Sequence, residues 1–300
     1  MPSPRLALRS FAGPVDFARS FSRPLRVVHI SDQHVGRVTP ESVQRAAIEL
    51  ANEQEPDLVA LTGDFVCHSL DYLDQLTSLL RAIRAPSVAV LGNHDHWSGA
   101  NEVRRALRSA GVELLDNANT RITLHGQTLQ VVGLDDAYTG HADLSRALVG
   151  LDPRLPTLGL SHIAEEAEGL WQAGASLVLS GHTHSGHVAW GRMHHLLIGG
   201  LAGHRYVHGL YGCRRGIEAP GAVYVNAGIG AAVMGLRLGE RARREVAVFR
   251  LGEMPGEALE HHAEQQALPG RAPSEQLKAR RIAQVERKAW LRDQKRRDER

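Results

Sequence analysis

Five short apolar runs in this sequence are each followed at once by aspartate, asparagine or histidine, and this recurring arrangement constrains the fold more than any other feature. Short apolar runs rich in β-branched residues are typical of buried strands. The polar residues mark the point where each strand ends. The five strand ends are Asp32-Gln33-His34, Gly63-Asp64, Gly92-Asn93-His94-Asp95, Ser161-His162 and Gly181-His182-Thr183-His184.

The segments between these runs predict an α/β protein with a largely parallel sheet, because predicted helices alternate with the strands. The expected helices span 40–54, 70–83, 101–110 and 165–172. The later half changes pattern, since residues 121–132 predict a β-hairpin around Gly126. Further strands are expected at 205–210, 222–226 and 246–251. We therefore expect a second, mixed sheet packed on the first.

The polar strand ends predict a divalent metal site. Ligands of open α/β sheets bind beyond the carboxyl ends of the strands, so these ends should gather at one place. Alternate side chains of an extended chain point the same way, which would let Asp32 and His34 face one ion together. In the same way His182 and His184 would reach into one cavity. Carboxylate, imidazole and amide ligands without thiolate suit Mn²⁺, Fe²⁺ or Zn²⁺.

The order D-x-H, G-D, G-N-H-D, H and G-H-x-H resembles that of the calcineurin-like metallophosphoesterase superfamily. Within it the chain is similar to the bacterial phosphodiesterase branch of the YkuE and YaeI type. The stretches 133–136, 209–211 and 225–230 extend the likeness to about Leu251. The resemblance implies the metallo-dependent phosphatase fold, a four-layer αββα sandwich of two mixed β-sheets flanked by helices.

The resemblance also implies a set of metal ligands. They are Asp32, His34, Asp64, Asn93, His162, His182 and His184. Asp32, His34 and His184 would hold one ion, and Asp64 would bridge it to a second ion held by the others. Two divalent ions are expected, with Mn²⁺ favoured over Fe²⁺ or Zn²⁺.

His94 would stay off the metals and face the substrate, with Asp95 orienting its ring. The expected reaction is hydrolysis of a phosphodiester, or of a phosphomonoester, by a hydroxide that bridges the ions. His94 would act as general acid or transition-state stabiliser.

Several polar residues outside the predicted ligand set also stand out in the sequence. His68 and His96 flank the motifs and would support the ligands from behind, whereas His29 lies inside a strand and suits the core. Cys67 is expected to be a packing residue. One further group would form either a substrate wall or a polar surface loop: Arg192, His194, His195, His204, Arg205 and His208.

Length and composition bound the class of protein. The chain of 300 residues is long enough for one large domain. It has no run of about 18 apolar residues, so no transmembrane helix is expected. Residues 1–24 lack the apolar core of a secretory signal and are read as mature protein. The 2 cysteines are too few for a disulfide framework and indicate reduced thiols, which predicts a cytoplasmic protein.

The expected organisation has four parts: an N-terminal segment (1–24), the metallophosphoesterase domain (25–251), a linker (252–274) and a helical or disordered tail (275–300). The tail has ten Lys and Arg against five Asp and Glu, a net charge of +5. The whole chain has +2, so the remainder has −3. The tail could contact nucleic acid or anionic lipid, or form a solvated extension.

Three alternatives to a phosphodiesterase remain open from the sequence. The first is a hydrolase of a UDP-linked lipid precursor, which Leu196-Leu197-Ile198 would favour if they line a groove. The second is a nucleic-acid-binding module that uses the basic tail. The third is a metal-binding relative that has lost activity.

Overall fold

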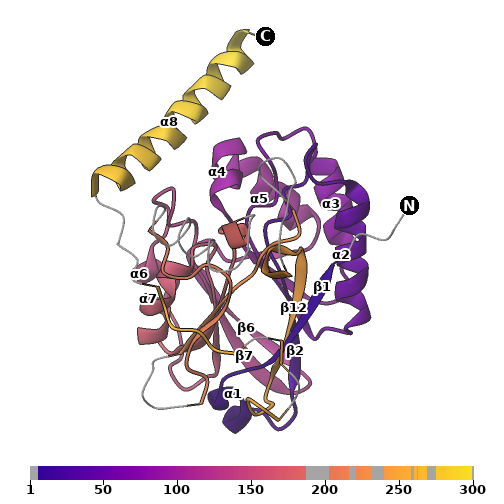
Figure 1. Cartoon of the computed structure of the whole chain (residues 1–300). Helices are drawn as coiled ribbons and strands as arrows, with labels where there is room; N and C mark the ends of the chain where they lie inside the picture. Colours follow the sequence, from indigo (N-terminus) through magenta and orange to yellow (C-terminus); the bar gives the residue numbers. More distant parts are fainter. Residues whose placement is uncertain are drawn as a thin grey trace.

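Two β-sheets form the centre of the molecule (Figure 1). The computed structural model describes residues 6–186, 203–215, 221–230, 240–257, 260–261, 263–268 and 275–298. The first sheet has the strand order β1 (Ala7–Ala12), β12 (Glu245–Leu251), β2 (Leu25–Ile30), β3 (Leu58–Thr62), β4 (Ser87–Val90) and β5 (Glu113–Leu114). The second has the order β10 (Gly209–Gly212), β11 (Ala222–Val225), β9 (Ala175–Ser180), β8 (Thr157–Leu160), β7 (Gln127–Gly133) and β6 (Ala118–Leu124).

Helices cover the outer face of each sheet, which gives the four-layer αββα arrangement (Figure 1). The first sheet packs under α2 (Glu41–Glu53), α3 (Leu73–Arg81) and α5 (Ala100–Ser109). The second packs under α6 (Leu144–Ala147) and α7 (Ala167–Gln172). The other α-helices are α1 (Val15–Ser20), α4 (Asn93–Ser98) and α8 (Glu275–Asp298). Both sheets are mixed, so the expected fold class is confirmed.

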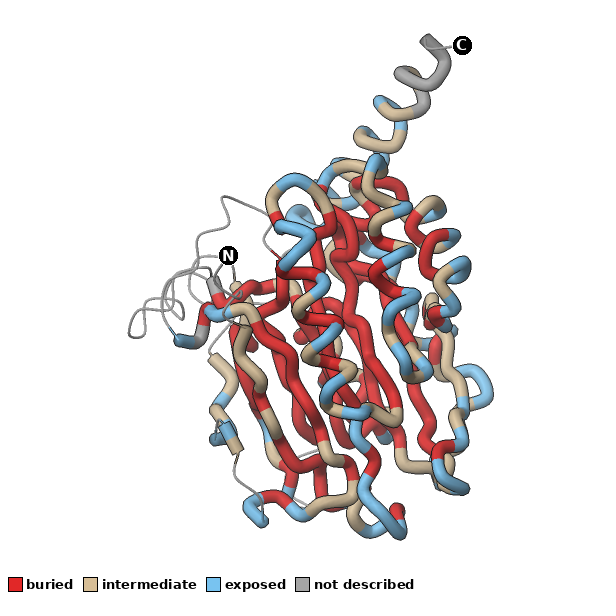
Figure 2. The backbone as a smooth tube through the Cα atoms, turned by 90° about the vertical axis from the view of Figure 1, so that its right-hand side faces the viewer, coloured by how far each residue is buried: buried red, intermediate tan, exposed pale blue. Residues whose placement is uncertain are grey.

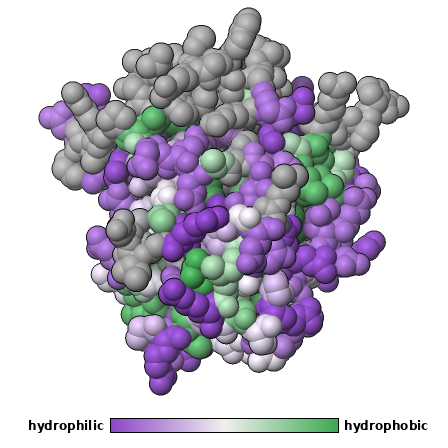
Figure 3. Space-filling view, turned by 60° about the horizontal axis from the view of Figure 1, so that its bottom comes forward, coloured by the Kyte–Doolittle hydropathy of each residue, from purple (hydrophilic) through white to green (hydrophobic). Residues whose placement is uncertain are grey.

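The central strands are buried on both faces, and their side chains alternate between two apolar layers. On β2, Leu25 and Val27 belong to the core between the sheets. Val28 and Ile30 instead pack beneath the helices of the first sheet. Figure 2 shows the strands as continuous buried segments inside a partly exposed helical layer. Figure 3 shows the side at the bottom of Figure 1, where hydrophilic groups prevail and hydrophobic groups form separate patches.

The strand directions bring the predicted site together. β2, β3 and β4 are parallel neighbours in the first sheet. β8 and β9 are parallel neighbours in the second. Their carboxyl ends therefore lie at one edge of each sheet, and the polar residues that follow them meet between the two edges.

The N-terminal residues belong to the first sheet. β1 pairs with β12 in parallel over its whole length, and β12 pairs with β2 in the antiparallel sense. The sequence-based boundary at residue 25 thus separated strands that share a sheet. The strand expected at 205–210 forms later, at Gly209–Gly212, and a short helix that was not among those expected, α4, begins three residues after the end of β4.

The segment expected as a linker packs on the domain in its described parts. Gln265 N donates to Leu210 O at 2.8 Å, beside the edge strand β10. Arg214 forms ion pairs with Glu260 and with Glu264 (2.8 Å). The tail forms α8, which contacts α4. No helix among the described residues is long and apolar enough to cross a membrane.

Candidate metal centre

The structure brings all seven predicted ligands together at the meeting of the two sheet edges. Two groups of side chains have ligand atoms within 4.8 Å of one another and could each hold a metal ion. The first group is Asp32, His34, Asp64 and His184, and the second is Asp64, His162 and His182. Asn93 joins the second group, since its Oδ1 lies 2.8 Å from His182 Nδ1. Their role as ligands stays a prediction.

Nitrogen and oxygen atoms of the first group converge on one small volume. His34 Nε2 lies 3.0 Å from His184 Nε2 and 3.5 Å from Asp64 Oδ2. His184 Nε2 lies 3.3 Å from Asp32 Oδ1. Asp32 and His34 are fully buried and the other two are nearly so. Such closely spaced lone pairs, shielded from water, are a suitable environment for a cation.

The second group contains an orphaned nitrogen that fits a metal ion. His162 Nδ1 lies 2.6 Å from the Thr62 carbonyl oxygen, to which it donates. In the neutral ring this leaves Nε2 unprotonated. This atom lies 3.4 Å from Asp64 Oδ2 and has no hydrogen-bond partner among the residues that the structure describes. A buried lone pair that faces a carboxylate is repelled unless a proton or a cation lies between them. The donor set therefore fits a divalent ion.

The pKa shifts in the centre have two causes, the neighbouring carboxylates and burial. Although burial disfavours the charged ring, the carboxylates of Asp64, Asp32 and Asp136 raise the pKa of His162 to about 10. Burial raises the pKa of Asp32 to about 6. Burial also holds the pKa of His182 well below its ordinary value, so this ring is neutral and can offer a lone pair.

The ligand loops use a left-handed backbone rather than the extended chain that the sequence analysis assumed. The φ angles of the five non-glycine ligands concerned are 51° at Asp32, 46° at His34, 55° at Asp64, 74° at His182 and 49° at His184. Hydrogen bonds hold these turns, because His182 N donates to the Asp32 carboxylate and His94 N donates to Asp64 Oδ1 at 2.8 Å.

The motif at 225–230 supports the Asp32 loop from behind. Gly230 N donates to the Asp32 carbonyl at 2.7 Å, and Ile229 N donates to Ser31 O at 3.1 Å. Gly228 has φ +75°, and a Cβ there would lie 2.6 Å from Asp32 Cβ. This motif therefore positions a predicted ligand without carrying chemistry itself.

Asp95 has a different contact from the one expected. Its Oδ1 accepts from Phe65 N (2.8 Å) and Val66 N (3.2 Å), and its Oδ2 accepts from Gly92 N (2.9 Å). The carboxylate thus lies on three backbone amides rather than on the His94 ring. Asp95 is a positioning residue that ties the start of α4 to the loop after β3.

The His94 ring lies at the edge of the centre, among aromatic neighbours that the sequence analysis missed. Its centroid is 4.7 Å from that of His34 and 4.9 Å from that of Trp97. Tyr138 lies 5.1 Å from His182 and 5.8 Å from Trp97. Trp97 stands one helical turn after Asn93 on α4, and this spacing is the signal that could have placed it at the rim.

The remaining polar predictions divide as follows. His96 Nε2 lies 2.7 Å from Asp135 Oδ1, and Arg104 donates to Asp135 Oδ2 at 3.0 Å, so these residues form a network beside α4. His29 is fully buried and bonded to Thr62, as a core residue would be. The predictions for residues 192–198 concern residues outside the described part of the chain.

A two-sheet αββα sandwich with a buried histidine and aspartate cluster at the joined sheet edges defines the class of metallophosphoesterases. Residues 25–186 match the model of the family described as calcineurin-like phosphoesterase. The chain belongs to this family.

Three proteins of known sequence show how similar the chain is to its relatives. The chain is 30% identical over 249 residues to phosphodiesterase YaeI of Escherichia coli, covering 78% of this chain and 85% of that protein. It is 29% identical over 232 residues to the uncharacterized metallophosphoesterase YkuE of Bacillus subtilis (75% and 78% covered). It is 26% identical over 259 residues to the UDP-2,3-diacylglucosamine pyrophosphatase LpxG of Chlamydia trachomatis (69% and 78% covered). The chain is accordingly a hydrolase of phosphoric esters.

Proposed function

We propose that this protein is a binuclear, metal-dependent phosphodiesterase. The position of the Asp64 carboxylate supports this most directly. Its Oδ2 lies 3.5 Å from His34 Nε2 and 3.4 Å from His162 Nε2, and Asp64 belongs to both ligand groups. One carboxylate between two sets of nitrogen ligands can bridge two divalent ions.

The two ligand groups would hold one ion each, and nitrogen and oxygen donors of this kind suit Mn²⁺, Fe²⁺ or Zn²⁺. When bound, two such ions supply positive charge for the phosphoryl oxygens and lower the pKa of the water that attacks phosphorus. The chain itself keeps six of the seven predicted ligands buried, with His182 half-buried, and fixes the His162 ring through the Thr62 carbonyl.

His94 supplies a hydrogen-bond donor at the edge of the centre. Burial lowers the pKa of His94, with Asp64 opposing this, so the neutral ring with one N–H is favoured near neutral pH. Its Nδ1 is buried and has no hydrogen-bond partner within the described residues. We propose that the ring donates a hydrogen bond to the oxygen that develops negative charge, either on the phosphoryl group or on the leaving alcohol.

The phosphodiester is the favoured substrate because the relative YaeI is named a phosphodiesterase. A UDP-linked lipid with a pyrophosphate bond is the second candidate, which the similarity to LpxG supports. Nucleic-acid binding by the tail is less favoured. Lys288 and Arg281 of α8 lie on the rings of Trp97 and Tyr138, and nucleic acid would have to displace these contacts.

The test is turnover by the purified chain after removal of metal and addition of Mn²⁺, Fe²⁺ or Zn²⁺. Bis-p-nitrophenyl phosphate, p-nitrophenyl phosphate and UDP-2,3-diacylglucosamine separate the diester, monoester and pyrophosphate activities. We expect Asp64→Ala to lose both bound metal and turnover, and the exposed control Asp74→Ala to keep both. Inactivity of the native chain with every ion and substrate would refute the proposal.

A further inference from the structure

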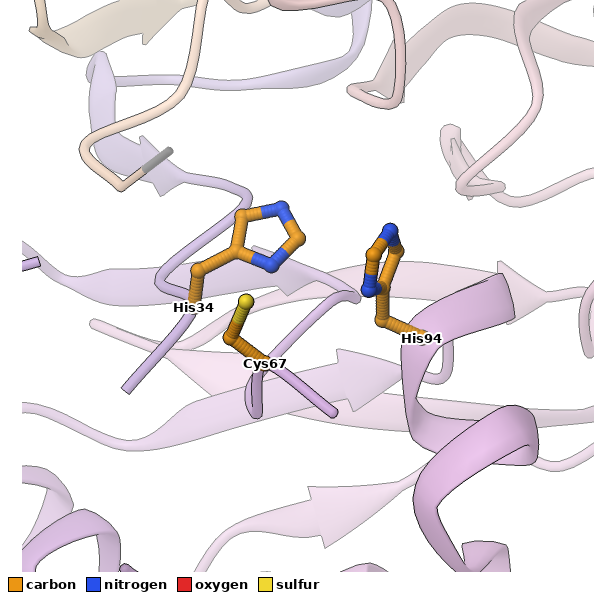
Figure 4. A group of neighbouring side chains, drawn as sticks. All are labelled: His34, Cys67 and His94. Carbon is orange, nitrogen blue, oxygen red and sulfur yellow. The ribbon is translucent and has the colours of Figure 1, made fainter. Parts of the chain in front are cut away.

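A thiol lies beside the predicted metal centre. Cys67 follows β3 in the loop that also carries Asp64, is 8% exposed, and is not in a disulfide. Its Sγ and one ring nitrogen each of His34 and His94 all lie within 4.8 Å of one another. Figure 4 shows that the three side chains come from three segments of the chain and face a common space.

The fold itself holds these segments together. Val35 N donates to Phe65 O at 2.8 Å and Cys67 N donates to Val35 O at 3.3 Å, so the loops after β2 and β3 run side by side beyond the sheet. The Asp95 carboxylate accepts from Phe65 N and so fixes the first turn of α4 against the same loop. Backbone contacts therefore place Cys67 near both histidines.

We propose that His34, Cys67 and His94 form a site for a thiophilic divalent cation, Zn²⁺ or Cd²⁺, in addition to the two predicted ion positions. Thiolate and imidazole are the ligands that such ions prefer. A tetrahedral ion needs sulfur and nitrogen donors about 3.5 Å apart. The donors lie within 4.8 Å of one another, so they must approach by at most about 1.3 Å, which side-chain rotation can supply. On binding, the thiol releases its proton to solvent as the sulfur–metal bond forms.

Occupancy of this site should inhibit the enzyme, a consequence that rests on the proposed function. His34 belongs to the first ligand group as well as to the thiol site, and an imidazole ring that already binds one cation is a weaker ligand for a second. His94 would at the same time become a metal ligand, which would hold its ring towards Cys67 and away from the substrate. A thiophilic ion at this site should therefore inhibit turnover even when the other ligands hold their ions.

The thiol suits a cation better than an oxidant. Burial, and secondarily the Asp64 carboxylate, raise the pKa of Cys67. The thiolate is the form that reacts with oxidants, so a protonated and buried thiol reacts slowly.

The first test is spectroscopic and does not depend on turnover. Cd²⁺ is added to the Mn²⁺-loaded chain, and the ultraviolet charge-transfer band from thiolate to Cd²⁺ is titrated. In the native chain and in the matched control Cys213→Ser, we expect the band to saturate at one Cd²⁺ per chain. In Cys67→Ser and Cys67→Ala we expect no band. A band that persists without Cys67, or its absence from the native chain, would overturn the site. Circular dichroism verifies that each variant is folded.

The second test measures inhibition of bis-p-nitrophenyl phosphate hydrolysis by Cd²⁺ and Zn²⁺. Cys67→Ser should need at least about tenfold more Cd²⁺ for half inhibition, with Mn²⁺-supported turnover unchanged. Equal inhibition of the native chain and Cys67→Ser would overturn the competition. If no chain turns over but the band depends on Cys67, the proposed function fails and the thiol site stands.

Discussion

Asp32, His34 and the other left-handed ligands hold their side chains in a backbone conformation that costs about 1–3 kcal/mol each away from glycine. The structure retains it because neighbouring groups over-determine the turns. The Asp32 carboxylate accepts from His182 N, and Asp64 Oδ1 accepts from His94 N. The ligands thus fix one another's loops, and the strain is stored where the predicted chemistry occurs.

Replacement of His94 by alanine should impair catalysis far more than metal binding. The ring lies beside the ligand groups, whereas its backbone N–H supports Asp64 and survives the substitution. Loss of a general acid or donor at this position is worth about 10²–10⁴-fold in turnover. Bound metal, measured by mass spectrometry, should stay near the native value. His125→Ala, in the turn between β6 and β7, is the control, and metal loss that parallels activity loss in His94→Ala would contradict the assignment.

A methyl group at Gly92 should disturb the centre by steric contact alone. Gly92 has φ −117°, which any residue adopts. A Cβ there would lie 2.6 Å from Asp64 N and 2.9 Å from His162 Nε2. We expect Gly92→Ala to lower metal content and to cost about 1–3 kcal/mol of stability.

The control for that steric effect is Gly111→Ala, which has open space around it but φ +84°. It should destabilise the fold through its backbone without changing metal content. Equal metal content in the two variants would contradict the steric explanation.

Glu245 should make stability depend on acid pH. The carboxylate is fully buried, and its Oε1 accepts from Tyr224 Oη at 2.7 Å and Ala227 N at 3.0 Å. Although burial opposes ionisation, His208 and these donors lower the pKa of Glu245 from 4.5 to about 2. As the pH falls, the carboxylate of Glu245 is therefore protonated at a higher pH in the unfolded chain than in the folded chain. The contribution, about 3 kcal/mol, is present above pH 4.5 and is lost as the pH falls towards 2.

Urea unfolding of the native chain and of Glu245→Gln at pH 7 and pH 3 checks this. The difference in unfolding free energy should shrink by about half at pH 3, since the pH then lies between the two pKa values. An equal difference at both pH values would show that the substitution acts through packing instead of charge.

At the scale of single elements, α8 is attached to the site rim by cations on aromatic rings. Lys288 Nζ lies 4.3 Å from the centre of the Trp97 ring, and Arg281 Cζ lies 3.7 Å from that of Tyr138. Arg292 also donates to the Trp97 carbonyl. Each cation–ring contact is worth about 0.5–1 kcal/mol when exposed. An isolated polar helix is marginally stable, so docking should protect α8.

Hydrogen exchange of α8 tests this attachment. The double variant Arg281→Gln, Lys288→Gln should exchange about 5–30-fold faster, as expected for a loss of about 1–2 kcal/mol. The matched double variant Arg280→Gln, Arg287→Gln removes equal charge from exposed positions and should exchange like the native chain. Equal acceleration in both variants would mean that net charge, and not the two ring contacts, holds the helix.

For the whole molecule, the sequence predicted the two-sheet class and the meeting of the polar strand ends, because apolar runs identify strands and parallel strands end together. It did not predict how the ligands are held. The D-x-H pair meets through left-handed turns, which a pattern of alternate residues does not reveal. β1 and the buried Glu245 were also missed, since their partners lie far away in the chain. Long-range pairing leaves no local pattern.

The same long-range arrangement makes metal binding a property of the whole fold. Asp32, His34, Asp64 and Asn93 follow strands of the first sheet, whereas His162, His182 and His184 follow strands of the second. Ions held by both sets would join the two sheets, and an ion at 100 times its dissociation constant stabilises the native state by about 2.7 kcal/mol.

Removal of metal should therefore lower the melting temperature of the entire domain. A change of about 2.7 kcal/mol corresponds to about 5–10 °C for a domain of this size. Calorimetry with Mn²⁺ and with chelator measures the shift, which Asp64→Ala should abolish and Asp74→Ala should retain. The transition should stay single, because both sheets share the same ligands and the core between them. A metal-independent melting temperature in the native chain would show that the cluster does not bind ions strongly enough to join the sheets.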